Sequence, residues 1–238
     1  MLTVTDLHTF RGTAHVLRGV SLTVPDATIV CLVGRNGAGK TTTMDSIMGV
    51  LPIKAGTVTF KGQEISRLGP HVRARLGIGY APDDCGIFPD LTVAESLAIG
   101  FWMAGKSSPR NGESAESREE FIYALFPELR KLLRRKCLYL SGGEKKMMAL
   151  GRAMAPGPSI LLLDEAFEGL APVVVNRFAD AVKRIKGMGI SLLIAESNVM
   201  TATKIADKLY VIDRGEILFE GNPKEVFENE EVMKTIRG

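Results

Sequence analysis

A glycine-rich loop lies between a short apolar run and a helical pattern near the N-terminus, and few folds accommodate that order. The apolar run 28–33 predicts a buried central strand, and Gly34-Arg-Asn-Gly-Ala-Gly-Lys40-Thr41 follows it directly. Met44, Ile47 and Met48 then recur at helical spacing, which predicts a helix over 40–48. The loop matches the pattern GxxxxGK[ST] in the strand-loop-helix context in which that pattern binds phosphate.

Each part of this loop has a physical role in holding a nucleotide. Its glycines let backbone N–H groups converge on phosphate oxygens, and the N-terminus of the following helix adds a favourable dipole. Lys40 can reach the β- and γ-phosphates, and the Thr41 hydroxyl can ligate Mg²⁺. A tight glycine turn without a ligand is the alternative. The predicted phosphate-binding residues are Gly34, Asn36, Gly37, Gly39, Lys40, Thr41 and Thr42.

Two carboxylates end a second apolar run, Ile160-Leu-Leu-Leu-Asp164-Glu165. The carboxyl end of a buried strand is where open α/β sheets bind their ligands. Asp164 is predicted to hold Mg²⁺, directly or through water, and Glu165 to polarise the attacking water. Because an apolar strand that ends in Asp-Glu is common by itself, the catalytic interpretation depends on the loop that contains Lys40.

The remaining chain alternates short apolar runs with helical patterns, which indicates an α/β fold whose parallel sheet is covered on both faces. The helical pattern is interrupted by a polar loop predicted at 105–114, and one charged amphipathic helix is predicted at 224–236. Strands are predicted at 2–4, 16–24, 56–60, 78–81, 190–195, 209–213 and 215–221, and helices within 91–155 and at 173–186.

Composition narrows the class of protein. The 238 residues are 45% hydrophobic and 24% charged, which excludes disorder of the whole chain. The net charge of +3 is small and its basic residues are dispersed, so no nucleic-acid partner is expected. The chain shows no secretory signal and no apolar run approaching the roughly 18 residues of a spanning helix, so we expect a cytoplasmic protein. Cys31, Cys85 and Cys137 lack a CxxC spacing, which argues against disulfides and a zinc site.

Leu140-Ser-Gly-Gly-Glu144 lies between the phosphate loop and Asp164-Glu165. It resembles the LSGGQ signature of ABC-transporter ATPases, and the order and spacing of the three motifs are similar to that family over essentially the whole chain. A Ser-Gly-Gly turn that caps a helix explains the local pattern equally well, but not the three motifs in this order.

The resemblance implies the ABC ATPase fold: a P-loop NTPase (RecA-like) parallel-sheet core with an antiparallel β subdomain and an inserted α-helical subdomain. It implies one ABC ATPase domain over 1–238, with a nucleotide-binding core at about 1–90 and 156–238 and a helical subdomain at about 91–155. ATP and Mg²⁺ are the implied cofactors, and the subunits are expected to dimerise on ATP.

The resemblance also assigns roles to residues. Ser141, Gly142 and Gly143 of one subunit are implied to contact the nucleotide held by the phosphate loop of the other, and a helix N-terminus with a serine and glycines is a reasonable anion site. Phe10 stands where the family places an aromatic residue that stacks on adenine, with core packing as the alternative. Because the resemblance builds each nucleotide site from two subunits, one chain alone would hold only half-sites.

Two positions depart from the family pattern. Asp83 follows Pro82 where the family has a glutamine that senses Mg²⁺ and whose loop touches the membrane subunit, and aspartate can still bind a cation. Ser197 stands where most members carry a histidine that contacts the γ-phosphate, which loses a potential positive charge. The residues expected to act in catalysis are Lys40, Glu165 and Ser197, with Thr41, Asp83 and Asp164 at the metal. The departures predict a heterodimer with two unequal sites.

Within the family, segments 34–43, 78–82, 87–93 and 168–172 resemble the LivF-type ATP-binding subunits of branched-chain amino-acid importers. The expected function is ATP hydrolysis that powers import of branched-chain amino acids or related small polar compounds. The expected partners are two transmembrane permeases, a second ABC ATPase and, indirectly, an extracytoplasmic substrate-binding protein, and the expected place is the inner face of the plasma membrane.

Two other functions remain open at this point. A nontransport ABC ATPase acting on nucleic acid or the ribosome usually has two ATPase halves or a long coiled-coil insertion, and neither is visible in the sequence. A small kinase could use the same phosphate loop, but the segment 140–144 argues against it.

Overall fold

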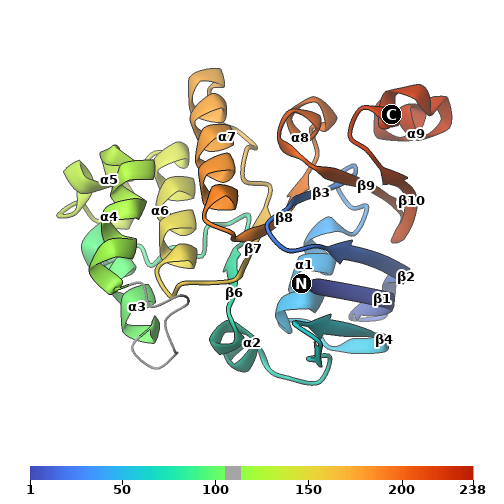
Figure 1. Cartoon of the computed structure of the whole chain (residues 1–238), viewed down its shortest axis with the longest axis horizontal. Coiled ribbons are helices and arrows are strands. Elements are labelled where there is room, and N and C mark those ends of the chain that lie inside the picture. Colours follow the sequence, from blue (N-terminus) through green and yellow to red (C-terminus); the bar gives the residue numbers. More distant parts are fainter. Residues whose placement is uncertain (105–113, 238) are drawn as a thin grey trace.

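The computed structural model describes residues 1–104 and 114–237, and its strands form two sheets (Figure 1). The larger, six-stranded sheet has the order β10-β9-β3-β8-β7-β6; β10 runs antiparallel to β9 and the other neighbours pair in parallel. Its strands are β3 (Ile29–Val33), β6 (Ile78–Ala81), β7 (Ile160–Asp164), β8 (Ser191–Glu196), β9 (Lys208–Asp213) and β10 (Glu216–Gly221). The predicted parallel sheet is therefore confirmed.

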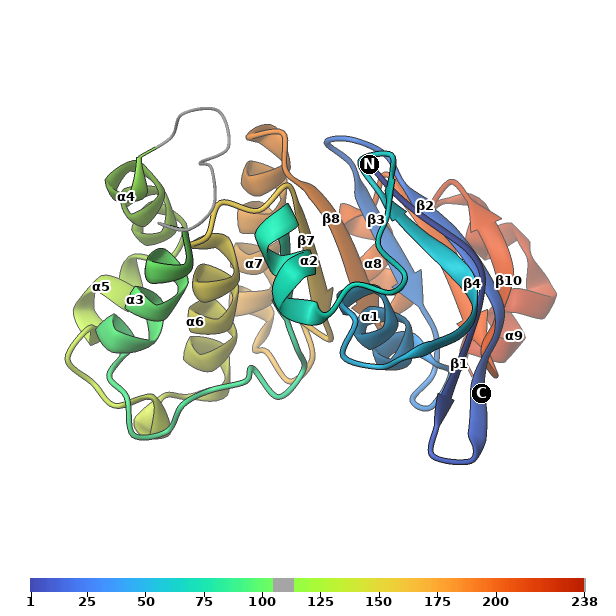
Figure 2. The same ribbon diagram turned by 90° about the horizontal axis from the view of Figure 1, so that it is seen from below.

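The smaller sheet is antiparallel, with the order β2-β1-β4-β5. It consists of β1 (Leu2–Arg11), β2 (Ala14–Val24), β4 (Ile53–Phe60) and β5 (Gln63–Glu64). The first strand is longer than the predicted 2–4 because it pairs with both β2 and β4. Helix α1 (Lys40–Met48) lies between the two sheets (Figure 2).

Helices cover the other face of the larger sheet and one end of the molecule. In Figure 1, α3 to α6 gather at the end away from the smaller sheet, and α7 and α8 lie along the sheet. The helices are α2 (Pro70–Leu76), α3 (Val93–Ala104), α4 (Ala115–Leu125), α5 (Pro127–Leu132), α6 (Gly142–Met154), α7 (Pro172–Gly187), α8 (Val199–Ile205) and α9 (Glu230–Arg237). None of these described helices combines the length and apolar character needed to cross a membrane.

The core has two parts because successive residues of a strand point to opposite faces of a sheet. On β3, Cys31 belongs to the cluster under α6, α7 and α8, whereas Val30 and Leu32 belong to the cluster around α1 and the smaller sheet. All five residues of β3 are buried. A strand buried on both faces needs a continuous apolar run, which is why this strand is visible in the sequence.

The predicted C-terminal helix at 224–236 is wrong as a single element. A 3₁₀ turn spans Glu225–Glu228, and α9 begins separately at Glu230. Asn229 interrupts the helix with an extended backbone, and its Oδ1 accepts the N–H of Val232 at 3.1 Å. An asparagine that caps a new helix competes with helix continuation. The polar loop predicted at 105–114 falls almost entirely on residues 105–113, outside the described residues.

Close backbone approaches hold the glycine-rich loop in place. A Cβ on Gly34 would lie 2.3 Å from the carbonyl oxygen of Ile212 on β9, so a larger residue does not fit. Gly215, with φ +83°, donates its N–H to the carbonyl of Ala38 at 2.9 Å, and its own carbonyl accepts the Arg18 N–H at 2.9 Å. The turn after β9 therefore ties the loop to the smaller sheet.

Candidate functional site

The predicted site residues come from four separated segments that meet at one edge of the larger sheet. The glycine-rich loop follows β3, Asp83 follows β6, Glu165 follows β7 and Ser197 follows β8. Parallel strands bring their carboxyl ends together, which is where such sheets bind ligands. An open cavity of ≈ 620 Å³ at this edge is lined by Arg11, Val16, Asn36, Gly37, Gly39, Lys40, Thr41, Thr42, Asp83, Glu165 and Glu168.

Lys40 lies at the centre of this edge and is 5% exposed. Its Nζ donates to the carbonyl oxygens of Gly34 at 2.7 Å and Arg35 at 3.1 Å. It also contacts Ser197 Oγ at 3.0 Å and Glu165 Oε1 at 2.9 Å. An ammonium has three protons for these four oxygens. A bound phosphate would therefore compete with Glu165 for the Lys40 charge.

The N-terminus of α1 is open toward the cavity. Its N-cap residue, Gly39, has φ 117°, and no side chain among the described residues caps the helix. The first N–H groups of a helix need partners, and an anion can supply them. The arrangement therefore fits a phosphate at the end of α1.

The Glu165 carboxylate is held from the next strand. Oε2 accepts the Ser197 N–H at 3.1 Å, and Oε1 accepts the Ser197 hydroxyl at 2.7 Å. Ser197 Oγ also lies 3.0 Å from Asn36 Oδ1, but its single proton can serve only one of these acceptors at a time. Glu165 has φ 48°, in the left-handed region that is uncommon for residues other than glycine.

Asp164 has the environment of a cation ligand. The side chain is buried, and neither carboxylate oxygen accepts a hydrogen bond of normal geometry within the described part of the chain. Burial raises the pKa of Asp164 to about 6, although the Thr41 side chain beside it acts in the opposite direction. Orphaned carboxylate oxygens next to a threonine hydroxyl fit Mg²⁺, which is usually held by one or two carboxylates together with substrate phosphates. Within residues 1–104 and 114–237, no cluster of three or more His, Cys, Asp or Glu could hold a metal alone.

Three residues near the site were missed from the sequence. Glu196 is buried and its Oε1 accepts the Phe167 N–H at 3.0 Å; burial raises the pKa of Glu196 to about 8. Lys146 on α6 donates to the carbonyl oxygen of Glu165. Arg11 lines the cavity, and its Nε donates to Thr42 Oγ1 at 3.0 Å. The sequence did contain a signal for Lys146. It lies four residues before Leu150, so the two share the face of α6 that is buried.

Phe10 does not line the cavity around Lys40. Its ring stacks on His15 with the centroids 4.4 Å apart, and it lines a second cavity that also includes Arg11, Pro52 and Lys54. The pairing of β1 with β2 has a register shift between Thr9 and Phe10. Stacking of Phe10 on adenine stays a prediction.

Ser141, Gly142 and Gly143 also lie outside this cavity, at the start of α6. The Ser141 hydroxyl accepts the Glu144 N–H, and Glu144 Oε2 accepts the Ser141 N–H at 2.7 Å, which is a capping box. The helix-cap explanation of this motif is therefore correct locally. Contact of Ser141 with a nucleotide needs a second chain and stays a prediction.

Known proteins are similar to this chain in sequence and in architecture. The family model described as ABC transporter matches residues 17–168. The chain is 34% identical to the probable branched-chain amino acid transport ATP-binding protein LivF of Archaeoglobus fulgidus, covering 94% of this chain and 93% of that protein. It is also 34% identical to the lipopolysaccharide export system ATP-binding protein LptB of Escherichia coli K12, covering 94% and 91%.

A solved ATP-binding cassette of an ABC transporter, in its ADP conformation, has a TM-score of 0.85 and 28% identity over 100% of this chain and 98% of that one. The similarity confirms the expected P-loop fold with its parallel and antiparallel sheets. The chain therefore belongs to the ABC transporter family, as an ATP-binding subunit that couples ATP hydrolysis to transport.

Proposed function

We propose that this chain drives a multi-subunit importer of branched-chain amino acids or related small polar compounds by hydrolysing Mg²⁺-bound ATP. The observation that carries the ATPase part is the convergence of Lys40, Glu165 and Ser197 beside the open N-terminus of α1. The substrate class is supported by the likeness to LivF over nearly the full length.

In the proposed site, the backbone N–H groups of the loop and Lys40 hold the β- and γ-phosphates. Asp164, Thr41 and Asp83 hold Mg²⁺, which neutralises the phosphate charge when it is bound. Glu165 accepts a proton from the attacking water, and Ser197 orients the Glu165 carboxylate through two hydrogen bonds. A general base is effective only when its carboxylate is held in the right place, so the two short distances between Ser197 and Glu165 support this role.

The proposed division of the chain is a nucleotide-binding core at about 1–90 and 156–238 and a helical subdomain at about 91–155. The gathering of α3 to α6 at one end supports it (Figure 1). The exposure of Ser141 and Gly142 at the start of α6 leaves them free to reach the nucleotide of a second chain in a dimer formed on ATP.

A membrane subunit is the proposed partner at the segment that follows Asp83. Phe88, Leu138 and Tyr139 are exposed by 48%, 53% and 66%, and the Leu138 N–H bonds to the carbonyl of Pro89 at 3.1 Å, which joins the two segments. Exposed apolar side chains that lie together mark interaction sites. The full assembly would hold two permeases, a second ABC ATPase and an external binding protein, at the inner face of the plasma membrane.

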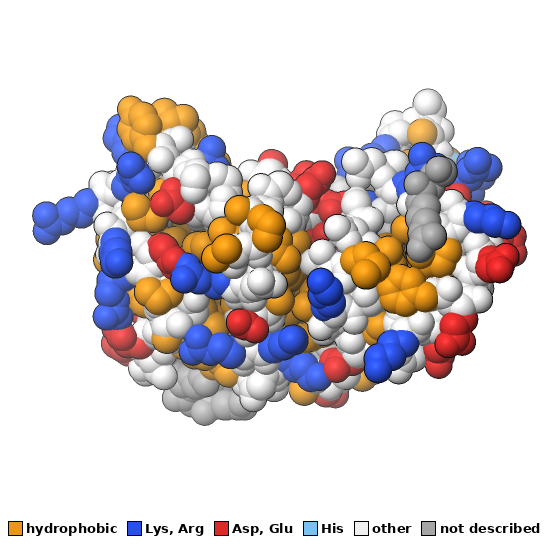
Figure 3. All heavy atoms as spheres, turned by 90° about the horizontal axis from the view of Figure 1, so that it is seen from above, with side chains coloured by type: hydrophobic (Ala, Val, Ile, Leu, Met, Phe, Trp, Pro, Cys, Tyr) orange, Lys and Arg blue, Asp and Glu red, His pale blue; other side chains and the backbone are white. Residues whose placement is uncertain are grey.

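Mild-detergent purification of the tagged chain from native membranes, followed by mass spectrometry, tests this function. We expect two hydrophobic permeases and a second ABC ATPase. Ribosomal or DNA-repair proteins in their place would contradict the transporter assignment. Figure 3 shows basic side chains interspersed with acidic and apolar ones over one face, which disfavours a nucleic-acid partner there.

Export of a lipid-linked substrate is the second candidate, because LptB matches this chain with the same identity as LivF. The same purification separates the two. If the chain belongs to an amino-acid importer, the co-purified permeases should be encoded together with an external binding protein. If it belongs to a lipopolysaccharide exporter, the co-purified proteins should instead be ones that bind lipid.

We further propose that the Arg11 guanidinium faces the nucleotide in place of Phe10. Its contacts with Thr42 and Asp45 hold it over the start of α1 at the cavity wall. An arginine guanidinium can add a cation–π attraction to a base, so we expect Arg11→Ala to weaken ATP binding by about tenfold, equivalent to about 1.4 kcal/mol, as measured by calorimetry.

Phe10→Ala is the matched control for this prediction, because it removes a neighbouring side chain of the same strand. If Arg11 contacts the base, Phe10→Ala should bind ATP with an affinity within about twofold of the parent protein. A twofold change in Kd corresponds to well under 1 kcal/mol of binding free energy. If Phe10→Ala weakened ATP binding and Arg11→Ala left it unchanged, Phe10 and not Arg11 would be the adenine contact.

A further inference from the structure

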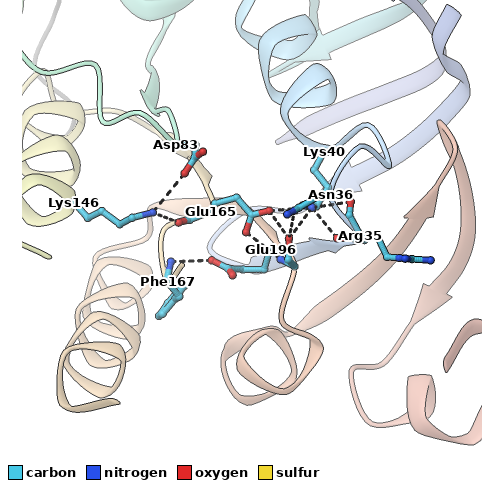
Figure 4. A network of polar contacts seen from close by, with 10 residues as sticks. Arg35, Asn36, Lys40, Asp83, Lys146, Glu165, Phe167 and Glu196 are labelled. Carbon is cyan, nitrogen blue, oxygen red and sulfur yellow. Dashed lines mark hydrogen bonds and ion pairs between the residues drawn. The ribbon is translucent and has the colours of Figure 1, made fainter. Parts of the chain in front are cut away.

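Lys146 joins three elements that meet behind the site. Its side chain is only 13% exposed, and its Nζ donates to the main-chain carbonyl oxygen of Glu165. The same Nζ lies 3.7 Å from Asp83 Oδ1 (Figure 4). One ammonium thus connects the helix α6 with the residues that follow β6 and β7.

The contact falls on a part of the backbone that needs support. Glu165 has φ 48°, and a residue in this region costs of order 1 kcal/mol or more and persists only where its surroundings fix it. Its carbonyl accepts one further N–H, that of Glu168 at 3.2 Å. A charged donor strengthens such a bond, so Lys146 contributes directly to the position of this peptide.

The two ends of Glu165 are therefore held by different groups. Lys40 and Ser197 hold the carboxylate, whereas Lys146 holds the backbone. In the proposed function, a bound phosphate draws Lys40 away from Glu165, and Lys146 is not part of the cavity lining. The hydrogen bond from Lys146 to the Glu165 carbonyl therefore does not depend on a bound phosphate.

We propose that Lys146 is a positioning residue, which fixes the Glu165 backbone to α6, the helix that Ser141 caps. A movement of α6 would shift the Glu165 backbone, and with it the carboxylate, through the hydrogen bond from Lys146. Lys146 itself would not contact the nucleotide. The inference rests on the proposed role of Glu165 in hydrolysis.

The test compares Lys146→Met with Lys145→Met in the full chain. Each change removes one ammonium from the same turn of α6 and replaces it with an apolar side chain of similar length. Among the described residues, the Lys145 side chain makes no hydrogen bond or ion pair. For Lys146→Met we expect kcat to fall by about 10-fold to 100-fold with the ATP dissociation constant within about twofold, because a misplaced catalytic group loses rate and not binding. Lys145→Met should match the parent protein.

Hydrogen exchange gives a readout that does not depend on activity. The Glu168 N–H bonds to the carbonyl held by Lys146, so peptides covering 164–170 should exchange faster in Lys146→Met and not in Lys145→Met. Lys146→Arg, which keeps a charged donor, should recover kcat to within about threefold of the parent, since a cation that reaches the same carbonyl restores the bond.

Three outcomes would overturn the inference: equal kcat and exchange in the two methionine variants, a loss of ATP affinity as large as the loss of kcat, or a Lys146→Arg variant no better than Lys146→Met. Glu165→Gln measured in parallel separates this failure from that of the proposed function. If Glu165→Gln retains full turnover, the role of Glu165 itself is wrong; if Glu165→Gln is inactive and Lys146→Met is normal, only the role of Lys146 is wrong.

Discussion

Glu165→Gln is expected to lower kcat for ATP hydrolysis by about 100-fold or more, with ATP affinity changed by less than about threefold. Glutamine has the same shape, and its amide oxygen can still accept the Ser197 N–H that now lies 3.1 Å from Oε2. The amide cannot accept a proton from water at neutral pH, so the loss falls on the chemical step. Steady-state kinetics of the full chain or its complex, with calorimetric ATP binding, measure both quantities.

The control for this variant is Glu216→Gln, which makes the same chemical change at an exposed position of β10. It should leave turnover and binding as they are in the parent protein. With hydrolysis blocked, Glu165→Gln should also accumulate an ATP-bound dimer in light scattering, as the proposed cross-chain role of Ser141 requires. Undiminished turnover in Glu165→Gln would refute the assignment of the general base.

Lys40→Ala is expected to weaken ATP binding by about 100-fold, equivalent to about 2.7 kcal/mol, and to abolish measurable hydrolysis. The ammonium is nearly buried beside the open N-terminus of α1, where a phosphate would lie. Its removal also leaves the buried Glu165 carboxylate without its cation. Breaking a buried pair in this way typically costs about 3–5 kcal/mol of folding stability, so a lower melting temperature is expected too.

The double variant Lys40→Ala/Glu165→Gln separates the two effects of Lys40. Neutralising Glu165 removes the orphaned charge, so the melting temperature should rise above that of Lys40→Ala while ATP affinity stays low. Lys183→Ala, at an exposed position of α7, controls for loss of a lysine. Recovery of ATP affinity in the double variant would show that Lys40 acts only by stabilising the fold.

Sequence patterns predicted most of the larger sheet because its strands are buried on both faces. The runs 160–164 and 209–213 appear as β7 and β9 within a residue, and the helix at 40–48 is exact. The pattern failed where a local capping bond competed with periodicity, as at Asn229, which divides the predicted terminal helix. Apolar periodicity records burial, but it does not record which side chain will cap a turn.

The sequence alone determined that a phosphate loop and an Asp-Glu pair lie at strand ends, and hence that they meet at one edge of a parallel sheet. It also determined the family, because three motifs in order are far more specific than any one of them. These features are local, and each depends only on neighbouring residues.

Only the tertiary structure decided which distant side chains touch those motifs. Lys40 and Ser197 are separated by 157 positions, yet Lys40 Nζ lies 3.0 Å from Ser197 Oγ. Lys146 reaches the Glu165 carbonyl from α6. Arg11, and not Phe10, lines the cavity around Lys40, where its contacts with Thr42 and Asp45 on α1 hold it. Such contacts depend on the packing of elements far apart in the chain, and no local pattern of residue types encodes them.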